Sequence, residues 1–131
     1  MNYHEDDRAQ RIFDVFPQVN GQINVSYVNS PQHVVAWHRH KKQTDYWFCP
    51  KGSFKVGLGR PREDGGVDVF WYYLSDKNFH VLQIPPGIWH GYKALQANSM
   101  MLYYLSEKYD ENDEEKVLPG HFGEDWKTVS K

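Results

Sequence analysis

The sequence lacks the features that commit a chain to a disulfide framework, a membrane or a nucleic acid. Its single cysteine, Cys49, excludes an internal disulfide and is typical of the reducing cytoplasm, where we expect this protein. No apolar run approaches the length that spans a bilayer, and the polar start MNYHEDDRAQ predicts no signal peptide. The net charge is -2 without a basic run, so we expect no nucleic-acid partner and no membrane partner.

Aromatic residues and histidines are what the sequence has in excess. Aromatics make up 16% of its 131 residues, and such rings favour pleated, half-buried surfaces and binding clefts. There are seven histidines, several of them close to predicted turns. Because imidazole changes its charge near neutral pH, this placement indicates chemistry at a histidine-lined site.

Short strand-like segments, separated by turn residues, run through most of the chain, and no long helical period interrupts them. The predicted strands are 22–28, 34–37, 46–49, 53–58, 67–74, 79–84 and 99–105. This pattern predicts an all-β sandwich or barrel in a single domain, residues 1–131. The aromatic run 70–73 is expected to pack within the sheet or to form a dimer face, and the acidic tract 110–115 to be a solvated loop.

Two neighbouring imidazoles and a rigid turn form the first chemical motif. His38 and His40 stand two residues apart on a predicted strand, so their side chains face the same side. The Pro-Pro-Gly turn at 85–87 cannot lie inside a helix or a central strand, and it fixes the position of His90, which follows it. If that side is a barrel interior, the three imidazoles converge in one cavity.

The spacing of this motif, HxH-x4-D-x6-G and then PxG-xx-H, resembles the two motifs of the cupin superfamily. The resemblance implies a cupin-type double-stranded β-helix, or jelly roll. In metal-binding cupins three histidines and a carboxylate hold a divalent metal, which here implies the ligands His38, His40, Asp45 and His90. From the residues alone, Asp45 is open between a metal ligand, a partner for His40 and a solvated strand-start residue.

A longer, ordered set of motifs resembles the dTDP-4-dehydrorhamnose 3,5-epimerases. The segments 22–26, 74–78 and 84–92 are similar to the QxNxS, LSxxN and IPPGxxHGF segments of that family. Tyr103 and Tyr109 have the spacing of its YKxxxxY element. The HRHK, YDEND and GIWH pieces are also similar to sugar 3,4-ketoisomerases, a neighbouring cupin family.

This second resemblance implies an isomerase of carbohydrate biosynthesis that acts on a dTDP- or other NDP-linked 4-keto-6-deoxyhexose, without a metal cofactor. His38 matches the base that removes a proton beside the ketone, and Tyr103 matches the acid on the opposite face. Tyr109 would stack on the nucleotide, and Arg8 would meet the diphosphate from a neighbouring subunit of a homodimer. The implied substrate-binding residues are Arg8, Gln22, Asn24, His40, His90 and Tyr109.

Three positions depart from the epimerase pattern. Val35 replaces an arginine, and Asp45 replaces the lysine that steadies the enolate, which is the wrong sign of charge for that task. The aspartate that orients the catalytic histidine lies in an extension beyond the motifs matched here, and Asp125 is a candidate to replace it. Two alternatives therefore stand beside the epimerase: the metal-dependent cupin, and a non-catalytic relative that binds sugar nucleotides.

Overall fold

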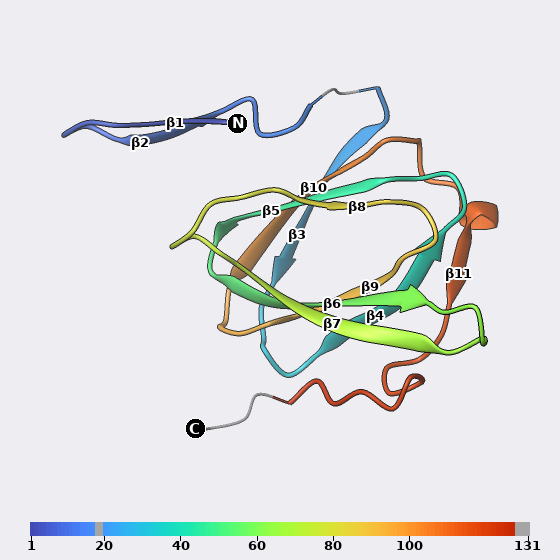
Figure 1. Ribbon diagram of the computed structural model, residues 1–131. Helices are drawn as coiled ribbons and strands as arrows, with labels where there is room; N and C mark the ends of the chain where they lie inside the picture. Colours follow the sequence, from blue (N-terminus) through green and yellow to red (C-terminus); the bar gives the residue numbers. More distant parts are fainter. Residues whose placement is uncertain (18–19, 128–131) are drawn as a thin grey trace.

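We describe residues 1–17 and 20–127 of a computed structural model. The described chain is all-β apart from one 3-10 turn, and the strands form two facing antiparallel sheets and a separate hairpin (Figure 1). The elements are β1 (Asn2–Glu5), β2 (Gln10–Phe13), β3 (Gln22–Val28), β4 (Val34–His40), β5 (Asp45–Lys51), β6 (Ser53–Pro61), β7 (Val67–Ser75), β8 (Leu82–Ile84), β9 (Trp89–Ala94), β10 (Ser99–Leu105), η1 (Glu111–Asp113) and β11 (Glu114–Lys116).

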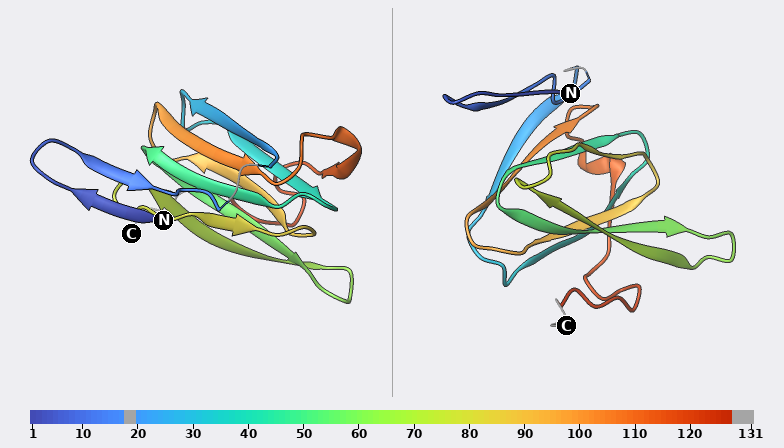
Figure 2. Two further views of the ribbon diagram at one scale, coloured as in Figure 1. Left: turned by 90° about the horizontal axis from the view of Figure 1, so that it is seen from above. Right: turned by 60° about the vertical axis from the view of Figure 1, so that its left-hand side comes forward.

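The two sheets carry the strands in the orders β3-β10-β5-β8 and β11-β4-β9-β6-β7. They wrap around a shared interior, as the two views of Figure 2 show. The strand order, together with the structural relatives described below, confirms the predicted cupin jelly roll. The strand predicted at 53–58 extends to Pro61, because β6 and β7 stay paired up to Pro61 and Val67.

One hydrophobic cluster fills the space between the sheets. Trp47, Phe54, Leu74 and Met101 are all at most 4% exposed there. Cys49 belongs to the same cluster, and burial raises the pKa of its thiol to about 11.

A second cluster lies on the outer face of the five-stranded sheet. Trp37 and Trp89 precede His38 and His90 on their strands, so they point away from the interior that the histidines face. Phe122 and Trp126 of the C-terminal segment cover them, with ring centroids 5.3 and 5.2 Å from that of Trp37. The C-terminal segment runs below this sheet in Figure 1, and it covers the face of the sheet that points away from the cavity.

One segment, the acidic tract 110–115, differs from expectation. The prediction that 110–115 is a solvated loop was wrong: these residues form η1 and the start of β11, and β11 pairs with β4. Asp113 is buried there, and its carboxylate accepts backbone N–H groups of Lys41, Lys42 and Gln43. The tract therefore fixes the loop that follows β4.

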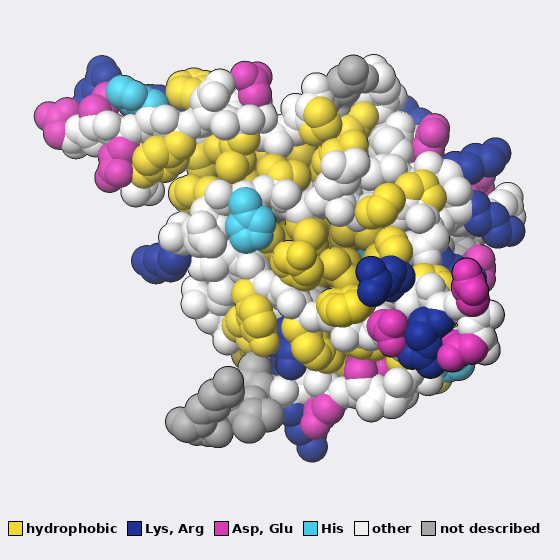
Figure 3. All heavy atoms as spheres, viewed as in Figure 1, with side chains coloured by type: hydrophobic (Ala, Val, Ile, Leu, Met, Phe, Trp, Pro, Cys, Tyr) yellow, Lys and Arg dark blue, Asp and Glu magenta, His cyan; other side chains and the backbone are white. Residues whose placement is uncertain are grey.

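The remaining surface features concern β7 and the N-terminus. Three aromatic side chains of β7 are exposed: Phe70 (44%), Tyr72 (47%) and Tyr73 (56%). Figure 3 shows that hydrophobic side chains cluster on one face of the molecule. The β1–β2 hairpin stands outside the two facing sheets. No helix within the described ranges is both long and apolar enough to cross a membrane.

Candidate active site

A cavity of about 240 Å³ opens between the two sheets. Its lining comes from both sheets and from the segment after β10, and it includes Asn24, His38, His40, Gln43, Asp45, Trp47, His90, Tyr103, Tyr109 and Glu114. His38, His40 and His90 line the side formed by β4 and β9, and Tyr103 with Asn24 lines the side formed by β10 and β3. The sequence-based expectation that imidazoles from separated strands converge in one cavity is thus confirmed.

The pairing of β4 with β9 brings the histidines together. His38 lies directly opposite His90 in the register, and their ring centroids are 6.4 Å apart. His40 stacks on His90, with ring centroids 5.3 Å apart. The Pro-Pro-Gly turn is tied to this group, because the N–H of Gly87 donates to the carbonyl of His40 at 2.8 Å. Gly87 has φ +86°, a backbone conformation that residues other than glycine rarely adopt.

His38 forms a short hydrogen bond with Glu114. The distance from Nδ1 of His38 to Oε1 of Glu114 is 2.7 Å, and β11 places the carboxylate there by pairing with β4. The other oxygen, Oε2, accepts the hydroxyl of Tyr109 at 3.1 Å. Burial alone would raise the pKa of Glu114, but the charge of His38 and these hydrogen bonds bring it below its ordinary value. Glu114 is therefore ionised at neutral pH and fixes the orientation of the His38 ring.

Sequence reasoning missed Glu114 and offered Asp125 in its place. Asp125 does not line the cavity; it lies in the C-terminal segment, where its Oδ1 accepts the N–H of Lys127. Nothing in the pattern of the acidic tract separates Glu114 from its acidic neighbours. Only once the tract is known to form the strand EEK does alternation separate the two glutamates: Glu114 contacts His38 and Glu115 pairs with Arg39.

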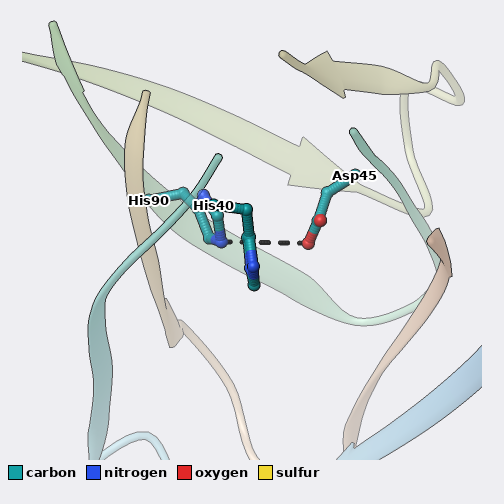
Figure 4. Close-up of side chains that lie close together, drawn as sticks. All are labelled: His40, Asp45 and His90. Carbon is teal, nitrogen blue, oxygen red and sulfur yellow. Dashed lines mark ion pairs between the residues drawn. The ribbon is translucent and has the colours of Figure 1, made fainter. Parts of the chain in front are cut away.

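A second polar network occupies the most buried part of the cavity wall. Asp45 is 4% exposed, and its two oxygens accept Nε2 of Gln43 at 2.6 Å and Nε1 of Trp47 at 3.0 Å. Nε2 of His90 lies 3.8 Å from Oδ2 of Asp45, and Figure 4 shows these two side chains pointing toward each other. The reading of Asp45 as a solvated strand-start residue was therefore wrong.

His90 is held neutral in this network. Burial lowers its pKa to about 4, although the charge of Asp45 acts in the opposite direction. Nδ1 of His90 lies 3.1 Å from the carbonyl of Ile88. A carbonyl oxygen only accepts, so Nδ1 carries the proton of the neutral ring and Nε2 presents a lone pair to the cavity.

The opposite wall is also preorganised. The register places Tyr103 opposite Asn24, and the hydroxyl of Ser26 donates to that of Tyr103 at 3.3 Å. Gln22 does not line the cavity: it donates to Oδ1 of Asn24 at 3.1 Å and accepts the N–H of Tyr109 at 2.8 Å. Gln22 thus joins the wall to the mouth of the cavity.

Arg8 lies outside the cavity of its own chain. It sits in the turn of the β1–β2 hairpin, is exposed, and pairs with Asp6 at 2.7 Å. The resemblance assigns it to the site of a neighbouring subunit, and that role stays a prediction.

Comparison with known proteins identifies the family. A family model described as FdtA, WxcM-like, C-terminal, matches residues 12–116. The chain belongs to the WxcM-like, C-terminal family.

Two relatives of this WxcM-like chain are named for glycan or polysaccharide synthesis. The probable low-salt glycan biosynthesis epimerase Agl13 of Haloferax volcanii is 34% identical over 108 residues, which are 76% of this chain and 68% of the relative. The spore coat polysaccharide biosynthesis protein SpsL of Bacillus subtilis is 37% identical over 94 residues, which are 66% and 61% of the two chains.

Solved structures share the fold of this WxcM-like chain. A dTDP-4-dehydrorhamnose 3,5-epimerase from Bacillus anthracis, with TDP and PPi bound, has a TM-score of 0.83 at 23% identity and covers 98% of this chain and 83% of its own. The sugar 3,4-ketoisomerase QdtA from Thermoanaerobacterium thermosaccharolyticum, in complex with TDP, has a TM-score of 0.73 at 20% identity and covers 93% and 88%. The jelly roll is therefore shared with enzymes of both resembled families.

Proposed function

We propose that the protein is a nucleotide-sugar epimerase or isomerase, which removes a proton beside the ketone of a dTDP- or other NDP-linked 4-keto-6-deoxyhexose. The observation that carries the proposal is the His38–Glu114 pair in a cavity that Tyr103 faces from the opposite sheet. The names of the relatives point to the same class of reaction.

His38 is suited to act as the base. Its Nδ1 is engaged by the Glu114 carboxylate, which can only accept, so Nδ1 carries the proton and Nε2 is free to take one from carbon. A proton on a carbon beside a ketone is acidic because the carbanion is delocalised as an enolate. When Nε2 takes that proton, the ring becomes an imidazolium whose charge Glu114 stabilises.

Tyr103 is suited to return a proton from the other side. Delivery to the same carbon, on the face opposite His38, inverts the centre and gives an epimer. Delivery to the adjacent carbon, after the enediol has transferred its own proton, moves the ketone instead. In either case the tyrosinate and the imidazolium that remain are reset by exchange with solvent, so the protons balance.

The other cavity residues are assigned to substrate binding. Asn24, His40 and His90 line the cavity and would contact the hexose, and Tyr109, 53% exposed beside Glu114, would contact the nucleotide. Gln22 supports Asn24 and Tyr109 from behind. In a homodimer, Arg8 of the hairpin would reach the diphosphate of a neighbouring subunit.

The metal-dependent alternative fits this chain less well. Ligand atoms of His40, Asp45 and His90 lie within 4.8 Å of one another, but His38, the fourth expected ligand, is paired with Glu114. The amide nitrogen of Gln43, a donor, contacts both Asp45 at 2.6 Å and His40 at 3.3 Å. A donor group in that position opposes a cation shared by the three side chains.

Solvent deuterium incorporation tests the proposed function. The purified protein is incubated in D₂O with a dTDP-4-keto-6-deoxyhexose, and mass spectrometry follows the mass of the sugar. We expect incorporation that requires His38 and that is unaffected in a His121→Asn control at an exposed histidine. Absence of incorporation into any such substrate, by folded protein that binds dTDP, would leave the non-catalytic binding relative as the better account. A stoichiometric metal whose removal abolishes incorporation would favour the metal-dependent cupin.

A further inference from the structure

The network around Asp45 leaves one acceptor, Nε2 of His90, without a hydrogen-bond partner among the described residues. Oδ1 and Oδ2 of Asp45 each accept one N–H group, from Gln43 and Trp47. Nδ1 of His90 donates to the carbonyl of Ile88, so its Nε2 carries only a lone pair. Within the residues that the structure describes, Nε2 of His90 makes no hydrogen bond, and its nearest charged neighbour is Oδ2 of Asp45 at 3.8 Å.

Two acceptors that face each other at this distance are unfavourable in a buried wall. A carboxylate oxygen and an imidazole lone pair that face each other repel unless a donor lies between them. A carboxylate oxygen can accept a second hydrogen bond beside the one from Trp47. The pair therefore calls for a donor from outside the chain, and both residues line the cavity through which it would enter.

The surrounding groups select the kind of donor. The negative charge of Asp45 repels phosphate, and no Lys or Arg lines the cavity among the described residues. A shared metal cation is opposed by the Gln43 amide, which donates toward Asp45 and His40. A neutral O–H group satisfies these conditions, because it carries no charge and donates a hydrogen to the facing acceptors.

We propose that Asp45 and His90 form a hydroxyl-binding subsite, in which a hydroxyl group of the bound hexose donates into the gap between Oδ2 and Nε2. This inference rests on the proposed function for its ligand class. The subsite orients the substrate: the sugar occupies the most buried end of the cavity, and the diphosphate lies toward the mouth, away from Asp45. It also gives a role to the aspartate that replaces the lysine of the resembled epimerases.

Calorimetric titration with dTDP and with dTDP-glucose tests the subsite. The measured quantity is the ratio of the two dissociation constants, which isolates the contribution of the hexose. His90→Asn keeps a donor for the Ile88 carbonyl and removes the Nε2 acceptor. His80→Asn is the matched control, because Nδ1 of His80 also lies 3.1 Å from a carbonyl two residues earlier, that of Asn78, outside the cavity.

We expect wild-type protein and His80→Asn to bind dTDP-glucose more tightly than dTDP, and His90→Asn to lose about tenfold of that preference while dTDP binds as before. Asp45→Asn is the second variant, with the same expected loss, and circular dichroism checks that each variant is folded. An unchanged preference in both folded variants would overturn the subsite but leave the proposed function standing. Failure of wild-type protein to bind dTDP would instead count against the proposed function. A stoichiometric metal in wild-type protein that is lost in His90→Asn would replace the hydroxyl with a cation.

Discussion

Replacing Glu114 by glutamine isolates the charge that the structure places against His38. Gln keeps the size of the side chain and can still accept from Nδ1 of His38, but it cannot stabilise the imidazolium by its charge. At 2.7 Å and an effective dielectric constant of about 20, the attraction between the two charges is about 6 kcal/mol. Solvent reaches both side chains, and a neutral hydrogen bond remains, so the net loss is about 1.5–3 kcal/mol.

That loss corresponds to a decrease of about 10- to 100-fold in the rate of proton abstraction. The assay is the initial rate of deuterium incorporation into a dTDP-4-keto-6-deoxyhexose at saturating substrate. Glu115→Gln is the matched control, because Glu115 is the next residue of the same strand and pairs with Arg39 on the other side of the sheet. If folded Glu114→Gln protein exchanged at the wild-type rate, the assignment of His38 and Glu114 as the base pair would be wrong.

Three further predictions concern the acid, the core and the effect of pH. Tyr103→Phe should lower product formation by about 100-fold or more while deuterium exchange at the His38 face persists, and comparing the two rates checks this. Trp37→Ala should lower the free energy of unfolding in urea by about 3–5 kcal/mol, because Trp37 is 0% exposed and packs against Phe122 and Trp126. Leu118→Ala, at a 78% exposed position, is the control and should change it by less than about 0.5 kcal/mol. The folded-state pKa of His90, about 4, lies below its unfolded value of 6.5, so the unfolded chain binds the extra proton first. The free energy of unfolding should therefore fall as the pH drops from 6.5 to 4, and it should fall less steeply in His90→Asn. Urea titrations at several pH values would measure this.

The sequence predicted the fold and most of the cavity because both depend on local patterns. Alternation at 22–28 predicted β3, although its polar residues face inward and Ile23, Val25 and Tyr27 are exposed. The stiff Pro-Pro-Gly turn placed His90 at the start of β9. The HxH spacing put His38 and His40 on one face, and pairing with β9 then brought all three imidazoles together. Such features follow from strand periodicity and proline geometry, which act over a few residues.

The missed features depend on contacts between distant segments. Glu114 is 76 residues from its partner His38, and no local pattern predicts that an acidic tract will add a strand to β4. The environment of Asp45 likewise depends on Gln43 and Trp47, whose side chains turn back toward it, and on His90 from another strand. A motif could show that Asp45 departs from the resembled epimerases, but only the assembled cavity shows what the carboxylate contacts.

A crystal structure of the protein with dTDP-glucose bound tests the central claim most directly, since it locates the sugar relative to the base and the acid. We predict that the hexose lies between Nε2 of His38 and the hydroxyl of Tyr103, with a ring carbon about 3–3.5 Å from Nε2. A hexose bound outside the cavity, or held with His38 and Tyr103 on the same side of its ring, would contradict the account.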